Sequence, residues 1–212
     1  MIVRPNDLPV RAVAQLGSHP LFKLVTRKES NVKSPKDLVG KKLGVIGYQD
    51  TGYYALLAVL AANGLKRDQL EIQAVGPAGV TQLMIAKSLD GIMATPEWAD
   101  AIETAGVGLD YFPVEKTFPA MAQAILTSDK MIKERPQAVR GFVHAVLQAV
   151  RDCMADPAAA AKDYVAAVPQ HTGKEVAIER ILRSYVKNVY ATEPASALGT
   201  FDPKRLATVQ KF

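Results

Sequence analysis

The run that best fits a ligand-binding loop stands between a short apolar stretch at 43–47 and a helical pattern. Its members are Tyr48, Gln49, Asp50, Thr51 and Gly52. A helix that begins directly after a parallel strand directs free backbone N–H groups into the crevice above the sheet. Glycine permits close approach of a ligand, and tyrosine can stack on a flat ring or donate a hydrogen bond. An ordinary capped helix with packed tyrosines is the alternative, and it stays open on the sequence alone.

Two further places carry residues suited to ligand contact. Glu97 and Trp98 follow a strand-like stretch at 90–94, at the edge where α/β proteins bind ligands. Glu97 could pair with a ligand amine and Trp98 could stack on a ring. The alternative is an acidic residue favoured by a helix N-terminus, next to a packed tryptophan. His19 precedes a strand and could face a cleft, or it could be an ordinary loop histidine.

The sequence gives no positive sign of catalysis, of a cofactor or of a metal site. Its three histidines are scattered and do not have the spacing of metal ligands. The single cysteine, Cys153, excludes an internal disulfide and any multi-cysteine metal site. A nucleophile elbow, a phosphate-binding P-loop and a dinucleotide-binding glycine pattern are all absent. We therefore predict a protein that is not an enzyme.

The elements that must position these residues alternate along the chain. Strand-like stretches at 10–16, 21–26, 43–47, 70–75, 90–94, 107–112 and 122–127 are separated by helical patterns or turns. Helices are expected at 51–63, 80–88 and 96–105, and again at 136–150, 157–167 and 173–190. Short strands that alternate with helices predict an α/β fold with mostly parallel sheets.

Composition excludes several classes of protein. The chain has 212 residues, of which 49% are hydrophobic and 22% charged, as in a globular protein. No stretch reaches the roughly 18 consecutive apolar residues of a membrane-spanning helix. The formal charge of +5 is divided, because residues 46–121 hold nine acidic and four basic residues between two basic flanks. The basic residues form no dense face, so a nucleic-acid partner is not expected.

Several motifs, in order and spacing, resemble one known family. The run SPKDLVGKKLGV at 34–45 is followed by ANGL at 62–65 and by RPQAVRGF at 135–142. A segment at 87–92 also matches, with Ser88 and Gly91 as departures. Together these motifs resemble the NMT1-like periplasmic substrate-binding proteins of ABC importers for nitrate, sulfonates, taurine and thiamine-pyrimidine precursors.

The resemblance implies a two-lobe, type II periplasmic-binding-protein fold in which hinge closure traps a small molecule in an interlobe cleft. Residues 1–45 and 122–212 would form the first lobe and residues 46–121 the second, with crossings near 45–47 and 122–126. Since the family usually has further residues at each end, the fold is expected to be truncated at both ends. The helix start at 48–52 would then face the cleft, and Glu97, Trp98 and His19 are the other candidate ligand residues.

The same resemblance implies an importer permease as partner and a periplasmic location, although no signal peptide is visible. The ligand could be a ring-bearing or amine-bearing compound, such as a pyrimidine, or an anion, such as a sulfonate. Two other functions stay open. One is a ligand-sensing regulatory module, and the other is a pyrimidine-synthase-like enzyme of the same fold, whose cysteine-rich iron motif this chain lacks.

Overall fold

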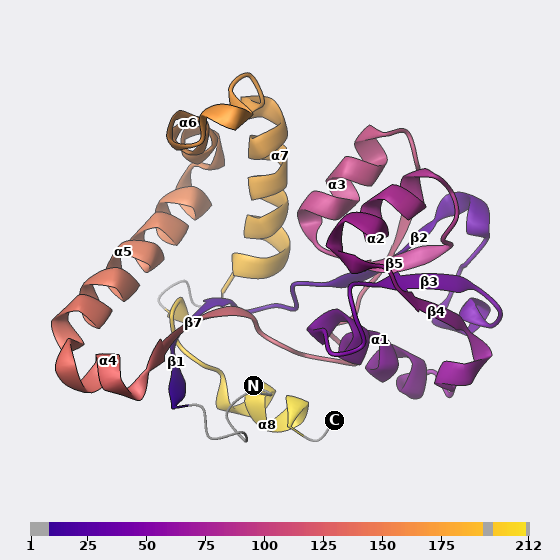
Figure 1. Ribbon diagram of the computed structural model, residues 1–212, viewed down its shortest axis with the longest axis horizontal. Helices are drawn as coiled ribbons and strands as arrows, with labels where there is room; N and C mark the ends of the chain where they lie inside the picture. The colour runs from indigo at the N-terminus through magenta and orange to yellow at the C-terminus, as the bar shows by residue number, and fades with distance from the viewer. Residues whose placement is uncertain (1–8, 193–196, 211–212) are drawn as a thin grey trace. The chain divides into compact units, whose positions relative to one another are not determined.

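The computed structural model describes residues 9–192 and 197–210 (Figure 1). The chain divides into two compact units. The first consists of Met1–His19 and Ala120–Ala207, and the second of Pro20–Pro119 with Thr208–Phe212.

The second unit is built on a five-stranded sheet with the strand order β4-β3-β5-β2-β6. Its strands are β2 (Lys23–Arg27), β3 (Lys42–Val45), β4 (Glu71–Ala74), β5 (Gly91–Ala94) and β6 (Leu109–Phe112). Its α-helices are α1 (Thr51–Ala62), α2 (Gly76–Ile85) and α3 (Pro96–Thr104), and short 3-10 turns lie at Lys28–Ser30, Pro35–Leu38 and Arg67–Gln69.

This sheet is mixed, which differs from the mostly parallel sheet predicted. β3 pairs in parallel with β4 and β5, whereas β2 runs antiparallel to β5 and to β6. The reason lies in the connection after β2, which contains only short 3-10 turns and no crossover helix. Without a crossover, the chain returns along the sheet in the opposite direction. The other four strands point the same way, so their carboxyl ends share one edge of the sheet.

Helices cover both faces of this sheet. α2 and α3 lie on one face and α1 on the other (Figure 1). The core under α2 and α3 joins strand residues such as Val25 and Ile92 to the helix residues Met84 and Ile102. All four of these side chains are fully buried. α2 begins at Gly76, four residues before the helix start expected at 80, because Pro77 suits a first helical turn.

Asp90 connects three strands at one edge of the sheet, opposite to the edge where the carboxyl ends lie. Its carboxylate accepts hydrogen bonds from Ser30 Oγ at 2.8 Å and from the backbone N–H of Lys42 at 2.9 Å. Arg27 pairs with it at 3.3 Å. Burial alone raises the pKa of Asp90, but these hydrogen bonds and the charges of Lys41 and Arg27 outweigh burial and lower it.

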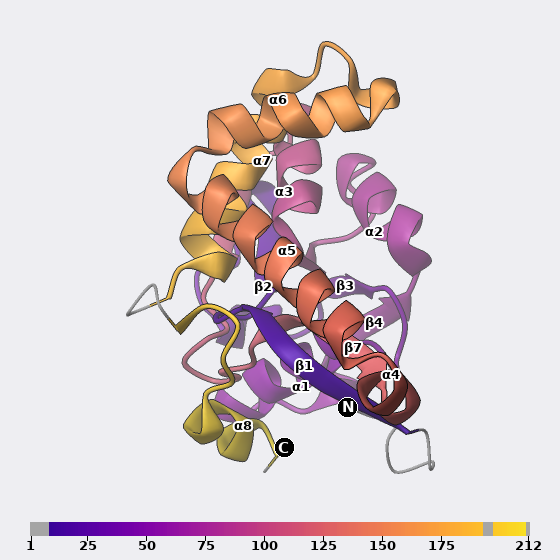
Figure 2. The same ribbon diagram turned by 90° about the vertical axis from the view of Figure 1, so that its left-hand side faces the viewer.

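The first unit contains a two-stranded antiparallel sheet and a group of helices. β1 (Val10–Gly17) pairs with β7 (Ala122–Ser128), and α5 packs against β1 (Figure 2). The helices are α4 (Asp129–Glu134), α5 (Pro136–Ala155), α6 (Pro157–Ala167), α7 (Glu175–Tyr185) and α8 (Pro203–Val209), with a 3-10 turn at Pro169–His171 and a π-helical turn at Val186–Tyr190. Across the described part of the chain, no helix is both long and apolar enough to cross a membrane.

The division between the units corrects the one expected from the sequence. Residues 20–45, expected in the first lobe with 1–19, belong to the second unit because β2 and β3 pair inside its sheet. The first passage between units is therefore at 19–20 rather than near 45–47. The second, at 119–120, precedes the expected 122–126 by a few residues. The motifs that carry the resemblance did not locate the crossings, because strand pairing across the sheet decides which unit a segment joins.

Candidate functional site

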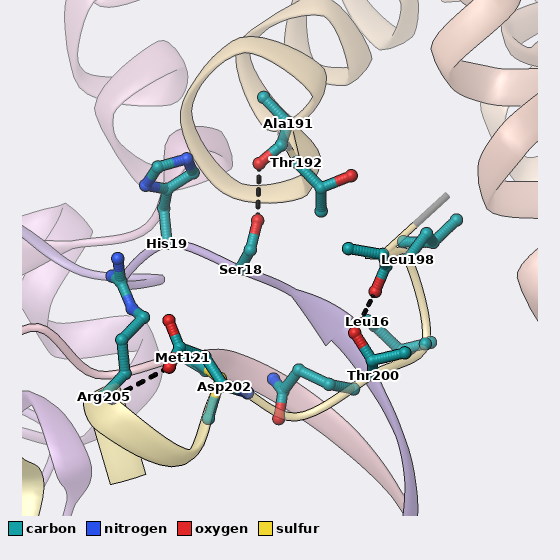
Figure 3. A pocket seen from close by; sticks show the side chains of 13 residues that line it. Leu16, Ser18, His19, Met121, Ala191, Thr192, Leu198, Thr200, Asp202 and Arg205 are labelled. Carbon is teal, nitrogen blue, oxygen red and sulfur yellow. Dashed lines mark hydrogen bonds between the residues drawn. The ribbon is translucent and has the colours of Figure 1, made fainter. Parts of the chain in front are cut away.

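The first unit contains a cavity of about 310 Å³ (Figure 3). Its walls come from the end of β1, the start of β7 and the chain on both sides of Gly199. The lining residues are Gln15, Leu16, Ser18, His19, Met121, Ala191, Thr192, Ala197, Leu198, Gly199, Thr200, Asp202 and Arg205. Segments that are far apart in the sequence thus form a single lining, which is partly polar and partly apolar.

Gln15 is the buried polar residue that organises the floor of this cavity. Its side chain is 6% exposed, and Nε2 donates to the carbonyls of Gly17 at 3.0 Å, of Gln123 at 2.9 Å and of Ala122. Three carbonyl acceptors fix the orientation of the amide, since only its nitrogen can donate. Gln123 has a φ of 48°, which is uncommon for a residue other than glycine. Gln15 therefore holds β7 where its backbone departs from regular strand geometry.

Hydroxyl and carboxylate groups complete the polar lining. Ser18 Oγ donates to the carbonyl of Ala191, and Thr200 Oγ1 donates to the carbonyl of Ala197. Asp202 Oδ1 accepts from the backbone N–H groups of Lys204 at 2.8 Å and of Arg205 at 3.2 Å. Asp202 thereby caps the start of α8.

His19 is the predicted site residue that lines this cavity (Figure 3). Its backbone N–H donates to the carbonyl of Val189 at 3.2 Å, and its carbonyl accepts from Ala122 at 3.1 Å. Arg205 lies beside it and donates from a terminal guanidinium nitrogen to the carbonyl of Ala120 at 3.4 Å. Sequence reasoning missed Gln15, Ser18 and Asp202 here, because only the fold brings their segments together.

The remaining predicted residues belong to the second unit, at the shared carboxyl edge of its strands. Asp50 caps α1 by accepting from the backbone N–H of Gly52 at 2.7 Å. The carboxylate of Asp50 thus accepts the hydrogen bond of a backbone N–H group that was expected to bind a ligand. Its negative charge also disfavours an anion at this end of the helix. Gly52 is buried, and a Cβ on it would lie 3.3 Å from Met93 Cβ. Packing thus accounts for this glycine. Gln49 and Thr51 are exposed.

The tyrosines near the start of α1 contact one another and the edge strand β4. Tyr48 donates its hydroxyl to the carbonyl of Ile72 at 3.1 Å. Its ring meets Tyr53 edge-on with centroids 5.3 Å apart, and the guanidinium of Arg67 lies 6.0 Å from the Tyr48 centroid. Tyr54 continues the cluster, 6.1 Å from Tyr53. These contacts hold the rings together at the surface, where Tyr48 and Tyr54 stay 48% and 42% exposed.

The end of β5 brings a residue that sequence analysis did not select. Thr95 is 5% exposed, and its Oγ1 has no hydrogen-bond partner within the described residues. It precedes α3, whose first turn holds Glu97 and has no side-chain cap. Trp98 packs against the core and against Phe22, with ring centroids 6.2 Å apart. A buried hydroxyl without a partner costs free energy, so such a group often marks a functional position.

Comparison with known proteins matches the chain to one family and to several relatives. A family model described as NMT1/THI5 like matches residues 1–160. The riboflavin-binding protein RibY of Chloroflexus aurantiacus is 29% identical over 159 residues, which is 74% of this chain and 45% of that protein. The taurine-binding periplasmic protein of Escherichia coli is 26% identical over 135 residues, 63% of this chain and 41% of the relative. The chain spans about half the length of the curated relatives it matches.

Solved structures show the same fold. The aliphatic sulphonate binding protein SsuA of Escherichia coli superposes with a TM-score of 0.73 at 13% identity, covering 99% of this chain and 68% of SsuA. The alkanesulfonate-binding protein of Xanthomonas axonopodis pv. citri gives 0.70 at 16% identity, with 96% and 66% covered. The desulfurization enzyme DSZB gives 0.56 at 17% identity, with 96% and 70% covered. The predicted two-lobe periplasmic-binding-protein fold is therefore confirmed, and it is a fold that an enzyme also uses.

Proposed function

The chain belongs to the NMT1/THI5-like family, and from this membership we propose that it is the solute-binding component of an ABC-type importer. The observation that carries the proposal is the family match over residues 1–160. Relatives named for binding riboflavin or taurine support it. In this role the protein binds a small molecule and delivers it unchanged.

We further propose an importer permease as the partner and the periplasm as the location. Two periplasmic binding proteins among the relatives and structural neighbours support the location. A neighbour named as the ligand-binding component of an ABC-type import system supports the partner. A similar fold at such low sequence identity does not show that two proteins bind the same ligand. The identity of the solute is therefore a question for experiment.

The proposed binding groups fall in two places. In the first unit they are His19 and the polar lining of the cavity. In the second they are Thr95, Glu97 and Trp98 at the carboxyl edge of the sheet, where α/β proteins bind ligands. Asp50, Gly52 and Tyr48 have structural contacts that already account for them. The ligand roles of these residues and of Gln49 and Thr51 stay predictions.

The test is direct binding. Native mass spectrometry of the purified chain would detect a co-purified small molecule, and calorimetric titration with riboflavin, taurine and an alkanesulfonate would follow. We expect one compound to bind with a micromolar or lower Kd and to raise Tm. If no compound binds and none co-purifies, the proposal fails.

A second measurement separates binding from catalysis. The bound compound is incubated with the protein and recovered for chemical analysis. A binding protein returns it unchanged, whereas conversion of the compound would assign this chain to the enzymes that share the fold with DSZB.

The proposed role of Glu97 has a test of its own. Glu97→Gln should weaken the binding of an amine-bearing solute, because it removes the negative charge that would pair with the amine.

A further inference from the structure

We propose that the cavity of the first unit binds a zwitterionic amino acid with an aliphatic side chain. The charged head of the ligand lies at one side of the cavity and its side chain at the other. Such a ligand would be the solute of the proposed binding protein, so the inference rests on that function and adds the chemical class of the solute.

Charged and apolar residues of the lining lie at opposite sides of the cavity. Figure 3 shows His19 and Arg205 at one side and Leu16 and Leu198 at the other. Asp202 belongs to the charged side, because its Oδ1 accepts from the backbone N–H of Arg205 at 3.2 Å. A ligand that fills the cavity therefore needs a polar head and an apolar body.

The charged side offers groups of both signs to the head of a ligand. Asp202 is exposed, and its Oδ2 accepts no hydrogen bond from the described residues, so this oxygen is open to an ammonium group. Arg205 brings a guanidinium, whose fork of N–H donors matches a carboxylate. A ligand with a single charge would be attracted by one of these side chains and repelled by the other. An α-amino acid carries both charges on one carbon and is attracted by both side chains.

Two buried donors of the lining are not the atoms that a ligand meets. Thr192 Oγ1 is buried and has no hydrogen-bond partner in the described part of the chain. Arg205 Nε is buried as well. A ligand in the cavity therefore contacts the terminal nitrogens of Arg205 and the other atoms of Thr192. Thr192 lies on the same side of the cavity as Leu198 (Figure 3), so it adds to the apolar side.

The size of the cavity and its apolar side limit the body of the ligand. A cavity of about 310 Å³ lies at the lower end of the range for small-molecule sites. Leu16 and Leu198 provide aliphatic surface without a hydrogen-bonding group. A short branched hydrocarbon side chain suits both limits, whereas a ligand of several fused rings exceeds the first.

The first experiment removes one charge of the ligand at a time. L-leucine is the zwitterionic probe, isocaproate is leucine without its ammonium group, and isoamylamine is leucine without its carboxylate. Chemical-shift titration of the full 212-residue chain gives the three Kd values. We expect leucine to bind with a Kd in the millimolar range or below. It should bind at least about fivefold more tightly than either analogue, because each analogue loses one charge-assisted contact.

The second experiment removes one charge of the protein. In Asp202→Asn the side-chain oxygen can keep the α8 cap, since asparagine caps as well as aspartate. Leucine and isoamylamine, which carry an ammonium group, should bind about threefold more weakly, while isocaproate should bind equally or better.

Two control variants should leave all three affinities unchanged. Asp156→Asn removes the same charge from a residue that caps α6 in the same way, through the backbone N–H groups of Ala158 and Ala159. Thr192→Val keeps the shape of a side chain in the lining and removes only its buried hydroxyl.

The outcomes separate this inference from the function on which it rests. Equal binding of the three probes, no binding of leucine at about 20 mM, or the same effect of Asp202→Asn on isocaproate as on isoamylamine would overturn the inference. The same would follow if Asp156→Asn or Thr192→Val weakened leucine binding as much as Asp202→Asn. A solute other than an amino acid that binds in the calorimetric titration, with no binding of leucine, would overturn the inference and leave the solute-binding function intact. Leucine binding with the expected charge dependence would support both.

Discussion

At the scale of single residues, Gln15 shows how one side chain can hold two distant strands together. It joins β1 to the start of β7 through the carbonyls of Ala122 and Gln123, more than a hundred residues away in the chain, and also bonds the carbonyl of Gly17 at the end of β1. Replacement by methionine keeps the length and loses every one of these bonds. The bonds to Gly17 and Ala122 are buried, and a buried carbonyl left without a donor costs about 1–3 kcal/mol.

We therefore expect Gln15→Met to lower the free energy of unfolding by about 2–4 kcal/mol. Urea denaturation followed by circular dichroism measures the change. Gln137→Met on the exposed face of α5 is the control and should change stability by less than about 0.5 kcal/mol. Equal values for the two variants would show that the Gln15 hydrogen bonds do not stabilise the fold.

Thr95 makes a second prediction at this scale. Thr95→Val has nearly the same shape and removes a buried hydroxyl that lacks a partner within the described residues. Stability should rise by up to about 1 kcal/mol, because a desolvation cost disappears. If Thr95 contacts the solute, the same change should weaken solute affinity several-fold.

Thr26 offers the matched control for Thr95. Its Oγ1 is also buried without a partner in the described part of the chain, but it lies inside β2 rather than at the carboxyl edge of β5. Thr26→Val should stabilise the protein and leave solute affinity unchanged. Parallel losses of affinity in both variants would remove Thr95 from the proposed site.

At the scale of elements, the Asp90 cluster connects β2, β3 and β5. The pKa of Asp90 is lowered on folding, so the folded protein favours the charged carboxylate. A group of this kind stabilises the protein above its unfolded pKa of about 3.9, and the stabilisation is lost as the pH falls through the lower folded value.

Asp90→Asn should therefore be less stable than the native sequence by about 1–3 kcal/mol at pH 7. The difference should shrink as the pH is lowered below about 4, because the carboxylate is protonated first in the unfolded chain and only at lower pH in the folded protein. Urea midpoints measured at pH 7 and pH 3 give both quantities. A difference independent of pH would mean that the carboxylate charge has no part in stabilising this edge of the sheet.

Most elements could be predicted from the sequence, and the exceptions have physical reasons. All seven predicted strands are present, with ends that differ by up to two residues, and the helix at 157–167 agrees to the residue. The periodicity of these elements is a local property, so the sequence alone predicts them. The reversed direction of β2 could not be predicted, because it follows from strand pairing across the sheet. Except for His19, the residues that line the cavity could not be predicted either, because the fold brings them together from distant segments.

At the scale of the whole molecule, the second unit is an unbroken stretch of chain, from Pro20 to Pro119, apart from the last few residues of the protein. Its main buried cluster lies entirely within that stretch. We expect residues 20–119, expressed alone, to unfold cooperatively in urea with an m-value typical of about 100 residues. A broad, non-cooperative transition would show that this unit depends on the rest of the chain.

The insertion of one unit into the other also bears on the order of folding. β1 leaves the ribosome early, but β7 follows only after the whole second unit has been synthesised. Pairing of β1 with β7 closes a loop of about a hundred residues, which costs entropy as long as that loop is unstructured. A second unit that folds first would reduce this cost by fixing the chain between the two strands. The sheet of the first unit is thus expected to form late, and pulsed hydrogen exchange should show protection in β3 and β5 before β1 and β7.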